Sequence, residues 1–390
     1  MKLRVVVLGA GCGGLELTTL LSDALGEKLD LTLVDKSATF YFGFSKFEVM
    51  FGYKTCDDVC MAYRHINKPG VKFLQANVLE IDPATKKITT DKGELEAEVI
   101  VIALGAEYDV AATPGLLEGG FEFFSLEGAQ KLQPIIPRFT KGKAIIGVTG
   151  VPFKCPPAPC EAALILHDYL VKRDLRKACE IDVVVPYHIP VHASIASSKA
   201  IIEAFAVKKI NFIPQRFVKS IDPLRHRAIL DNGVEMPFDL FMGIPVHRVP
   251  MVVERCGMAA DGWIQIDKDT SLTVYDGIYA IGDITHSTSP KAGVFAEEAA
   301  RLAAASILKS YMSKEMHVPS EDTGSCYIDF GDGAIGKVDA SYRNHKPGKG
   351  KFTEPSVALG REKQVFRASR EKRWFGIQVT EINAQVTETK

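Results

Sequence analysis

The chain has 390 residues, of which 46% are hydrophobic and 24% charged, and its formal net charge is −1 at pH 7. This length predicts two or three domains, and the near-neutral balance gives no general attraction to nucleic acid. No apolar run reaches the ~18 residues that span a bilayer, and the N-terminus runs straight into a predicted strand, so we expect no secretory signal. Eight cysteines are too sparse for a disulfide scaffold, so a pair that cycles would be catalytic rather than structural.

The first predicted strand, residues 5–8, is a continuous apolar run, and residues 15–25 follow at helical spacing. Between them, Gly9, Gly11 and Gly14 fit the pattern G-x-G-x-x-G. These glycines permit a tight turn and a close approach of the backbone to a pyrophosphate at the helix N-terminus. Asp35 stands 21 residues after Gly14, at the end of the next strand, where a carboxylate would bind ribose hydroxyls. The combination predicts a dinucleotide site.

Further apolar strands alternate with helices along the chain, which is typical of a doubly wound α/β protein. We expect strands at residues 99–103, 144–148, 181–185 and 277–283, and an alanine-rich helix at about residues 294–309. The predicted fold has two Rossmann-like domains. Residues 1–106 and 240–311 would form the FAD-binding domain, residues 107–239 the second domain, and residues 312–390 a C-terminal α+β docking segment.

Two later motifs favour FAD over NAD as the dinucleotide. Residues 278–283 read IYAIGD, which resembles the second FAD motif of two-dinucleotide-binding flavoproteins, whose aspartate corresponds to Asp283. Residues 102–105 read IALG and resemble the short A-x-G crossing of the same superfamily, ending at Gly105. Lys291 precedes the alanine-rich helix, where it could stabilise negative charge on a reduced flavin or be an ordinary solvated lysine.

The second domain lacks an intact nicotinamide motif. After its first strand the sequence reads GVTGVPFKC, with Gly147 and Gly150 only three apart and with Pro152 and Phe153 where backbone should meet phosphate. No acidic residue ends the next strand at Val185. NADH binding is therefore disfavoured.

Two cysteine motifs lie far apart in the sequence. Residues 155–161 read CPPAPCE, and Cys326 precedes Tyr327 in the run TGSCY, 171 residues after Cys155. With the FAD motifs, this combination resembles the sulfide:quinone oxidoreductase and flavocytochrome c sulfide dehydrogenase family. The resemblance implies that Cys155 is the flavin-side thiol and Cys326 the persulfide carrier, although the assignment could be reversed. Glu161 would shuttle a proton, or only complement the helix dipole.

The chain departs from this family at three points. Cys160 stands where an aromatic residue is usual, and could replace Cys155, trap a persulfide or simply pack. Gly43 occupies the place where some members attach FAD through a cysteine, so we expect non-covalent FAD. The third cysteine of the quinone-using members, expected near residues 123–125, is absent.

The C-terminal segment is basic. Between Arg343 and Arg373 there are ten Lys or Arg residues against three Glu, and Trp374 and Phe375 follow. This pattern predicts a peripheral contact with anionic headgroups, with the aromatic rings near the acyl chains and quinone taken from the bilayer. A solvated tail and a docking face for an acidic protein remain alternatives, and the residues after Ile377 read as a disordered tail.

The sequence thus predicts FAD-dependent sulfide oxidation with electrons passed to quinone, on the cytoplasmic face of the membrane, by a possible homo-oligomer. The alternatives are a sulfide dehydrogenase flavoprotein that reduces a cytochrome, a type II NADH:quinone dehydrogenase, and a thiol redox sensor with structural FAD. No metal site is predicted, because Cys56 and Cys60 have no partner pair. His188 and His192 lie in a loop that family members place near the active site, although surface histidines are more common.

Overall fold

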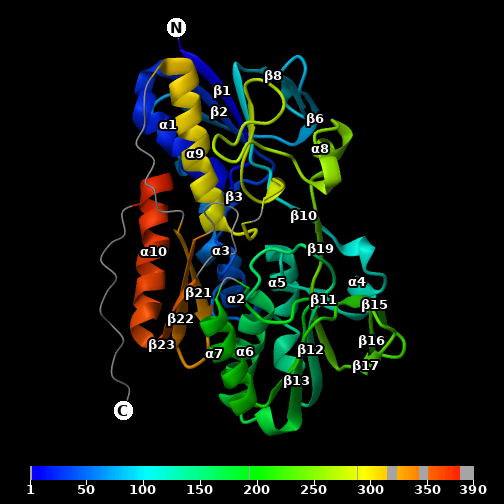
Figure 1. Cartoon of the computed structure of the whole chain (residues 1–390). Coiled ribbons are helices and arrows are strands. Elements are labelled where there is room, and N and C mark those ends of the chain that lie inside the picture. Colours follow the sequence, from blue (N-terminus) through cyan, green and yellow to red (C-terminus); the bar gives the residue numbers. More distant parts are fainter. Residues whose placement is uncertain (1, 193, 288, 314–322, 342–349, 378–390) are drawn as a thin grey trace.

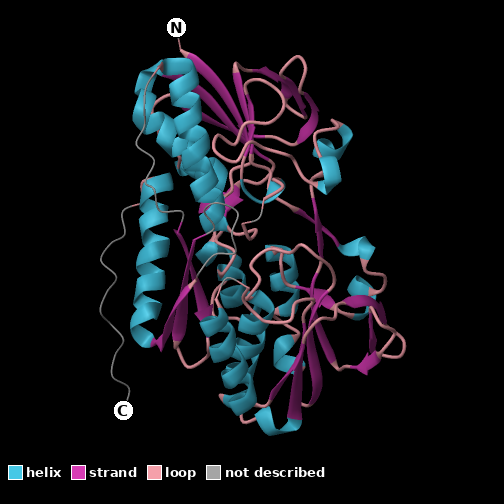
Figure 2. Cartoon of the chain, viewed as in Figure 1, coloured by secondary structure: helices cyan, strands magenta, loops and turns pink. Residues whose placement is uncertain are grey.

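The structure, a computed structural model, describes residues 2–192, 194–287, 289–313, 323–341 and 350–377 (Figure 1). Two five-stranded parallel sheets form two domains, and a three-stranded antiparallel sheet with a long helix forms the C-terminal segment (Figure 2). This arrangement confirms the predicted α/β class with two Rossmann-like domains and a C-terminal α+β segment.

The first sheet has the strand order β20-β9-β1-β2-β5. Its strands are buried on both faces: Val5 and Val7 pack toward one cluster of apolar side chains, and Val6 and Leu8 toward another. The strands are β1 (Leu3–Leu8), β2 (Leu29–Asp35), β5 (Val71–Gln75), β9 (Val99–Ile102) and β20 (Ile278–Ala280). One face carries α1 (Cys12–Leu25) and α9 (Gly293–Met312), and the other carries β6 (Val78–Asp82), β7 (Lys87–Thr90), β8 (Gly93–Glu96) and α8 (Met251–Arg255).

The second sheet has the order β11-β18-β12-β13-β14, and it is also parallel. Its strands are β11 (Phe121–Glu122), β12 (Gly142–Val148), β13 (Cys179–Val184), β14 (Ile210–Ile213) and β18 (Leu240–Ile244). One face carries α5 (Leu126–Leu132), α6 (Ala158–Val171) and α7 (Ile195–Lys208). The other carries α4 (Leu116–Gly119), β15 (Val218–Asp222), β16 (Arg227–Leu230) and β17 (Glu235–Pro237).

The crossing between the two domains corrects one predicted boundary. Residue 240 was expected to open the return to the first domain, but β18 pairs with β12 in the second sheet. The chain crosses instead through β10 (Glu107–Asp109) and β19 (Val246–Arg248), which pair with each other as an antiparallel ribbon. The apolar run of β18 fits a buried strand in either sheet, so its partner is decided by tertiary structure and not by local pattern.

The C-terminal segment is more regular than its sequence indicates. It forms β21 (Thr323–Asp329), β22 (Ile335–Ser341), β23 (Lys351–Ser356) and the helix α10 (Val357–Phe375), which lies along these strands in Figure 1. The end of α10 packs against the first domain, where the Trp374 ring lies 5.6 Å from that of Phe40 and 5.9 Å from that of Phe42. The tail predicted to be disordered lies outside the described residues.

Short elements complete the space between the domains. They are β3 (Thr39–Phe40), β4 (Met61–Ala62), α2 (Ser45–Met50) and α3 (Cys56–Val59).

None of the described helices combines the length and the apolar character needed to cross a membrane.

Candidate functional site

The loop between β1 and α1 is shaped to accept a phosphate group. Gly9 has φ +103°, and a Cβ atom there would lie 2.3 Å from the carbonyl oxygen of Ala103. A Cβ atom at Gly14 would lie 1.9 Å from the carbonyl oxygen of Gly9, so this crossing requires both glycines. A Cβ atom at Gly11 would meet no protein atom within 4 Å, and no side chain in this loop caps the N-terminus of α1. The first N–H groups of α1 therefore remain available to an anion.

This loop lines a cavity of about 1150 Å³, which exceeds the ~300–1,000 Å³ of typical small-molecule pockets. Both Rossmann-like domains and the C-terminal sheet contribute to its wall. The cavity contacts Gly9, Gly11, Asp35, Gly105, Asp283 and Lys291, and also Cys155, Glu161 and Cys326. Of the predicted site residues, only Gly14 is absent from this lining. It packs closely against the carbonyl oxygen of Gly9 and so supports the turn without reaching the cavity.

Asp35, Asp283 and Lys291 take different positions around the cavity. The Asp35 carboxylate accepts hydrogen bonds from the N–H groups of Ala10 and Ser37, both at 2.8 Å. Burial raises the pKa of Asp283, although two neighbouring lysines oppose the shift. The Lys291 ammonium donates to the carbonyl oxygens of Asp283 (2.7 Å) and Thr285 (3.2 Å), and burial lowers its pKa to about 8. Lys291 is therefore not a freely solvated lysine, and its role toward a flavin stays a prediction.

Cys155 lies in the loop of residues 149–157 that joins β12 to α6. Its backbone has φ +53°, which is unusual for a non-glycine residue, and its N–H donates to the carbonyl oxygen of Lys291 at 2.9 Å. This bond ties the cysteine loop to the segment that precedes α9. The loop therefore carries the Cys155 thiol from the second domain into the cavity of the first.

Cys326 comes to the same place from β21. It stands in the middle of that strand, paired with Val338 of β22, and both cysteines are free thiols. Burial, then the charge of Cys326 and then that of Glu161 raise the pKa of Cys155, so the three groups lie within electrostatic range of one another. Burial and Glu161 also raise the pKa of Cys326, to about 11. The fold thus brings these two cysteines, which are far apart in the sequence, to the same cavity.

Glu161 is in the first turn of α6, with only 2% of its surface exposed. Its carboxylate accepts the N–H of Asp329 at 3.1 Å and lies 3.6 Å from the ammonium of Lys363, which reaches over from α10. Burial raises the pKa of Glu161 to about 7, and Lys363 offsets only part of that effect. A carboxyl group with this pKa can both accept and donate a proton near neutral pH.

The second domain offers no comparable phosphate site at its first helix. The N-terminus of α6 carries the buried Glu161 carboxylate, and β21 covers it through the Asp329 hydrogen bond. A Cβ atom at Gly147 would meet Val218 and Phe241 at 2.8–2.9 Å, so this glycine serves packing within the domain. The broken glycine motif thus corresponds to a loop that delivers Cys155.

Four residues around the cavity had no motif in the sequence. The ammonium of Lys46 (α2) and the hydroxyl of Tyr108 (β10) both donate to the carbonyl oxygen of Phe124, the latter at 3.0 Å. The Lys154 ammonium lies 4.6 Å above the Tyr108 ring, and its backbone N–H donates to Nε2 of His247 at 3.3 Å. Only the position of Lys154 beside Cys155 could have drawn attention to this group.

The cluster keeps His247 neutral. Burial and the charge of Lys154 lower the pKa of His247 to about 3. Its Nδ1 lies 2.8 Å from the carbonyl oxygen of Pro245, so the imidazole proton is on Nδ1 while Nε2 accepts from Lys154. His247 thus supports the cysteine loop and does not titrate near neutral pH.

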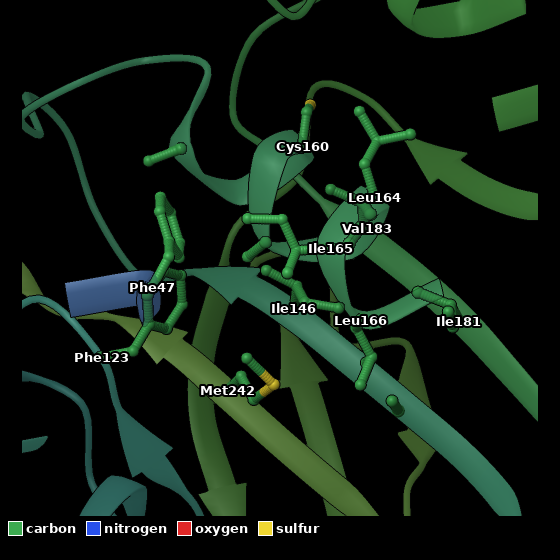
Figure 3. Packing of buried hydrophobic residues seen from close by; sticks show 14 of the residues in the cluster. Phe47, Phe123, Ile146, Cys160, Leu164, Ile165, Leu166, Ile181, Val183 and Met242 are labelled. Atoms are coloured by element: carbon green, nitrogen blue, oxygen red, sulfur yellow. The ribbon is translucent and has the colours of Figure 1, made fainter. Parts of the chain in front are cut away.

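Cys160, His188 and His192 lie outside the cavity wall. Cys160 is fully buried and packs with Leu164, Ile165 and Val183 in the core of the second domain, as Figure 3 shows. It is absent from the cavity wall, so packing accounts for it. His188 and His192 lie beside each other, 5.5 Å between ring centres, in a loop that is likewise not part of the wall.

The aromatic residues at the end of α10 do not face outward. Trp374 and Phe375 are 1% and 4% exposed, which contradicts the expectation that they dip toward lipid. The Trp374 Nε1–H donates to the buried Glu16 carboxylate at 2.9 Å, and Arg373 binds the same carboxylate at 2.9 and 3.1 Å. Part of the basic character of this segment is therefore used to attach α10 to α1.

Comparison with known proteins agrees with this architecture. The profile of the pyridine nucleotide-disulphide oxidoreductase family matches residues 3–300. The chain belongs to this family. It is a flavin-dependent oxidoreductase.

Two similar proteins of known activity align over most of the chain. The mitochondrial sulfide:quinone oxidoreductase of Mus musculus is 26% identical over 316 residues, which are 74% of this chain and 67% of that protein. The sulfide-quinone reductase of Aquifex aeolicus is 26% identical over 363 residues, 86% of this chain and 83% of that protein. A type II NADH:quinone oxidoreductase of Staphylococcus haemolyticus is 32% identical, but only over 131 residues, 33% of each chain.

Solved structures show the same fold. The crystal structure of the Aquifex aeolicus sulfide:quinone oxidoreductase has a TM-score of 0.83 at 22% identity and covers 96% of this chain and 92% of its own. The type II NADH dehydrogenase of Plasmodium falciparum, solved with NADH, has a TM-score of 0.74 at 13% identity, with coverage of 96% and 97%. These likenesses extend through the C-terminal segment, beyond the region matched by the family profile.

Proposed function

We propose that this chain oxidises sulfide through Cys155 and Cys326 and passes the electrons, by way of FAD, to quinone. The observation that carries the proposal is that a dinucleotide-type glycine loop and both distant cysteines line one and the same cavity. The aligned sulfide:quinone oxidoreductases support the same assignment.

The residues present fit a non-covalently bound FAD. The open N-terminus of α1 and the free space beyond Gly11 would hold the pyrophosphate, Asp35 the adenosine ribose, and Asp283 the ribityl chain. A side chain at Gly43 would project into open space at the cavity wall, but glycine offers no nucleophile for attachment. When bound, the flavin supplies two-electron transfer between the cysteine pair and the acceptor.

The cysteines would carry the sulfur chemistry. In the oxidised state a Cys155–Cys326 disulfide accepts attack by hydrosulfide: the S–S bond breaks, a new S–S bond forms, and one cysteine becomes a persulfide while the other leaves as a thiolate. The two electrons of the attacking sulfur now reside on the thiolate. A second hydrosulfide would then attack the outer sulfur of the persulfide, so that the persulfide S–S bond breaks, hydrogen disulfide leaves and a second thiolate remains. The two thiolates would give up two electrons to bound FAD as their disulfide re-forms.

Glu161 would accept and return the proton that is released in this exchange. Attack by hydrosulfide liberates a proton from sulfur, and the leaving thiolate must not be protonated by solvent before it reacts. A carboxyl group with a pKa of about 7 beside both cysteines is suited to accept and return that proton. Lys363 holds the ionised form in place.

The acceptor side of the cavity lies toward α10. Phe44, Tyr327 and Phe366 line the wall there, and the Lys363 ammonium lies 5.1 Å above the Phe44 ring. An aromatic opening of this kind suits a planar, apolar acceptor such as quinone better than the exposed contact needed by a cytochrome.

Membrane contact would be peripheral, on the cytoplasmic face. Because Trp374 and Phe375 are buried, they are not available to lipid. The solvent-exposed face of α10 would make the contact instead, because residues at helical spacing there combine apolar and basic character. Val357 and Val365 are 64% and 57% exposed, and Arg361 and Lys372 lie on the same face.

An anaerobic titration tests the proposal and separates its rivals. Purified holoprotein should lose its oxidised-flavin absorbance on addition of sulfide, should not respond to NADH, and should be reoxidised by a soluble quinone analogue. Bleaching by NADH alone would identify a type II NADH dehydrogenase. Reoxidation by a cytochrome but not by quinone would favour the flavocytochrome alternative, and bleaching without turnover would favour a redox sensor.

A further inference from the structure

Lys46 and Lys154 are two half-buried cations in the cavity wall. Neither forms an ion pair with any acidic side chain in the part of the chain that the structure describes, and both line the cavity. Burial lowers the pKa of Lys46, and the neighbouring Lys154 adds to that effect. Charged groups that are partly removed from water are normally paired or bind a ligand, so we expect an anion to bind at this cluster.

The nearest acidic groups are already engaged. Glu122 faces Lys46 across the cluster, but its carboxylate accepts the N–H groups of Phe124 and Ser125 at 2.7 and 2.9 Å. Asp283 acts on Lys154, and it is a single buried carboxyl group whose own pKa is raised by burial. Burial opposes the charge of Lys154, but Tyr108 and Asp283 outweigh it and raise the pKa, so Lys154 remains an ammonium group. Among the described residues, neither lysine has a carboxylate within ion-pair distance.

The polar groups converge on one spot. Lys46 and Tyr108 donate to the same carbonyl oxygen of Phe124, and Lys154 lies over the Tyr108 ring. Although burial raises the pKa of Tyr108, the charges of Lys154 and Lys46 outweigh it, and the net shift is downward. Lys154 directly precedes Cys155 in the chain, and both lysines and Cys155 line the cavity, so the spot lies on the thiol side of the wall.

Flavin binding does not supply the missing charge. The pyrophosphate is accounted for by the N-terminus of α1, and the oxidised isoalloxazine ring is neutral. The anion that must approach the Cys155–Cys326 disulfide in the proposed reaction is hydrosulfide.

We propose that Lys46, Lys154 and Tyr108 form a binding site for a small inorganic sulfur anion, hydrosulfide, beside Cys155. The proposal rests on the proposed function and adds to it the groups that select and position the substrate. The two ammonium groups hold the anion by charge, while Tyr108, whose hydroxyl donates to Phe124, positions Lys154. Lys154 directly precedes Cys155 in the cysteine loop. The acceptor would use the opposite wall, at Phe44 and Phe366.

The test uses thiocyanate, a monovalent anion that does not take part in the redox step, together with sulfide itself. In the holoprotein, the flavin difference spectrum gives the Kd for thiocyanate, and anaerobic kinetics give KM and kcat for sulfide. Lys46→Gln should raise the Kd for thiocyanate and the KM for sulfide at least tenfold, with kcat changed less than threefold. Lys46→Arg, which keeps the charge, should recover both to within threefold.

Lys131→Gln is the matched control, because Lys131 lies on the neighbouring helix α5 with 63% of its side chain exposed and an ion pair to Glu127. It should leave both constants unchanged. If Lys46→Gln does not fold, Lys154→Gln removes the other ammonium group, leaves the backbone N–H bond to His247 in place, and should weaken thiocyanate binding at least threefold.

Equal thiocyanate affinity in wild type and Lys46→Gln would overturn the inference, and so would thiocyanate that competes with quinone instead of sulfide. Failure of sulfide to bleach the flavin would instead overturn the proposed function. Thiocyanate binding needs no electron transfer, so the two failures are distinguishable.

Discussion

The helices α1 and α6 occupy equivalent places in the two Rossmann-like domains, yet they present opposite environments for a buried glutamate. Glu16 in α1 and Glu161 in α6 are both 2% exposed, and both are contacted by cations from α10. Burial opposes ionisation of Glu16, but hydrogen bonds from Arg373 and Trp374 outweigh it and lower the pKa. At Glu161 burial prevails, and the pKa rises to about 7.

The two glutamates differ in the hydrogen bonds that they receive, and therefore in whether they can exchange a proton near neutral pH. Glu16 receives charged hydrogen bonds on both carboxylate oxygens and is a permanent anion that anchors α10. Glu161 receives one backbone N–H, with Lys363 at a longer 3.6 Å, and keeps a proton within reach. The preceding loops differ in the same sense: residues 9–11 leave the N-terminus of α1 open, whereas residues 149–157 bring Cys155 to the cavity.

The loop before α6 should be the more sensitive one for sulfide chemistry. Cys155→Ser and Cys326→Ser should each slow flavin reduction by sulfide at least about 10³-fold, because serine cannot form the persulfide. Anaerobic stopped-flow absorbance measures the rate. Cys160→Ser is the matched control: its hydroxyl would be buried among apolar side chains, so it should cost about 1–3 kcal/mol of stability while sulfide still reduces the flavin.

The loop before α1 should be the more sensitive one for flavin binding. The backbone of Gly11 is extended (φ −75°, ψ −169°), so Gly11→Val introduces no strain, and its side chain would occupy the space needed by the pyrophosphate. FAD affinity should fall about 10- to 100-fold, as expected for an overpacking cost of about 1–3 kcal/mol. Fluorescence titration of apoprotein measures it. Gly150→Ala, in the second loop, would place a Cβ atom 2.8 Å from a methyl group of Val246 and should lower stability, but it should leave the FAD affinity of the folded protein unchanged. An equal loss of affinity there would contradict the assigned roles.

Replacing Glu161 should remove a pH dependence of the rate. Glu161→Gln is expected to slow flavin reduction about 10²-fold and to abolish the inflection near pH 7, because the amide cannot exchange the proton. Rate profiles between pH 5.5 and 9 (about three units around that inflection) test this. An unchanged profile would assign Glu161 to structure alone.

The same substitution has a stability signature with a defined sign. The carboxyl has a reference pKa of 4.5 and a folded pKa of about 7, so the folded state binds more protons between these values. Its contribution to stability is therefore present below pH 4.5 and is lost as the pH rises toward 7, by about 3 kcal/mol. Urea unfolding at several pH values should show a flatter profile for Glu161→Gln.

Glu16 should show the opposite sign. Its lowered pKa stabilises the fold above the unfolded value of 4.5, and this contribution is lost as the pH falls. Glu16→Ala should cost about 1.5–3 kcal/mol at neutral pH, because it leaves Trp374 and Arg373 without their acceptor. The exposed pair offers the control: Glu127→Ala should leave the free energy of unfolding nearly unchanged, because solvent screens its ion pair with Lys131.

Local sequence patterns predicted the parts of the fold that are local in origin. The strand, glycine loop and helix at residues 5–25 match β1 and α1, and Asp35 lies at the end of β2 as expected. Spacing could not show whether Cys155 and Cys326 approach each other, and only the family resemblance implied it. In the structure both cysteines line one cavity.

The remaining features depend on contacts between distant segments. The helix α10 was missed because its buried residues are few and irregularly spaced: Leu359, Trp374 and Phe375. Trp374 was interpreted as a membrane contact because its partner, Glu16, is 358 residues away. The cationic cluster is assembled from α2, β10 and the cysteine loop, so neither Lys46 nor Lys154 carried a signal of its own.

The most direct test of the central claim is to map the cysteine pair chemically. The holoprotein is oxidised anaerobically with diamide and divided. One portion is digested and analysed by mass spectrometry, and the other is titrated undigested with sulfide while flavin absorbance is followed, and is then mapped in the same way. The account predicts one disulfide between the peptides of Cys155 and Cys326, which sulfide converts to a persulfide as the flavin bleaches. Cysteines that stay free under these conditions, or Cys155 linked to Cys160 instead, would contradict it.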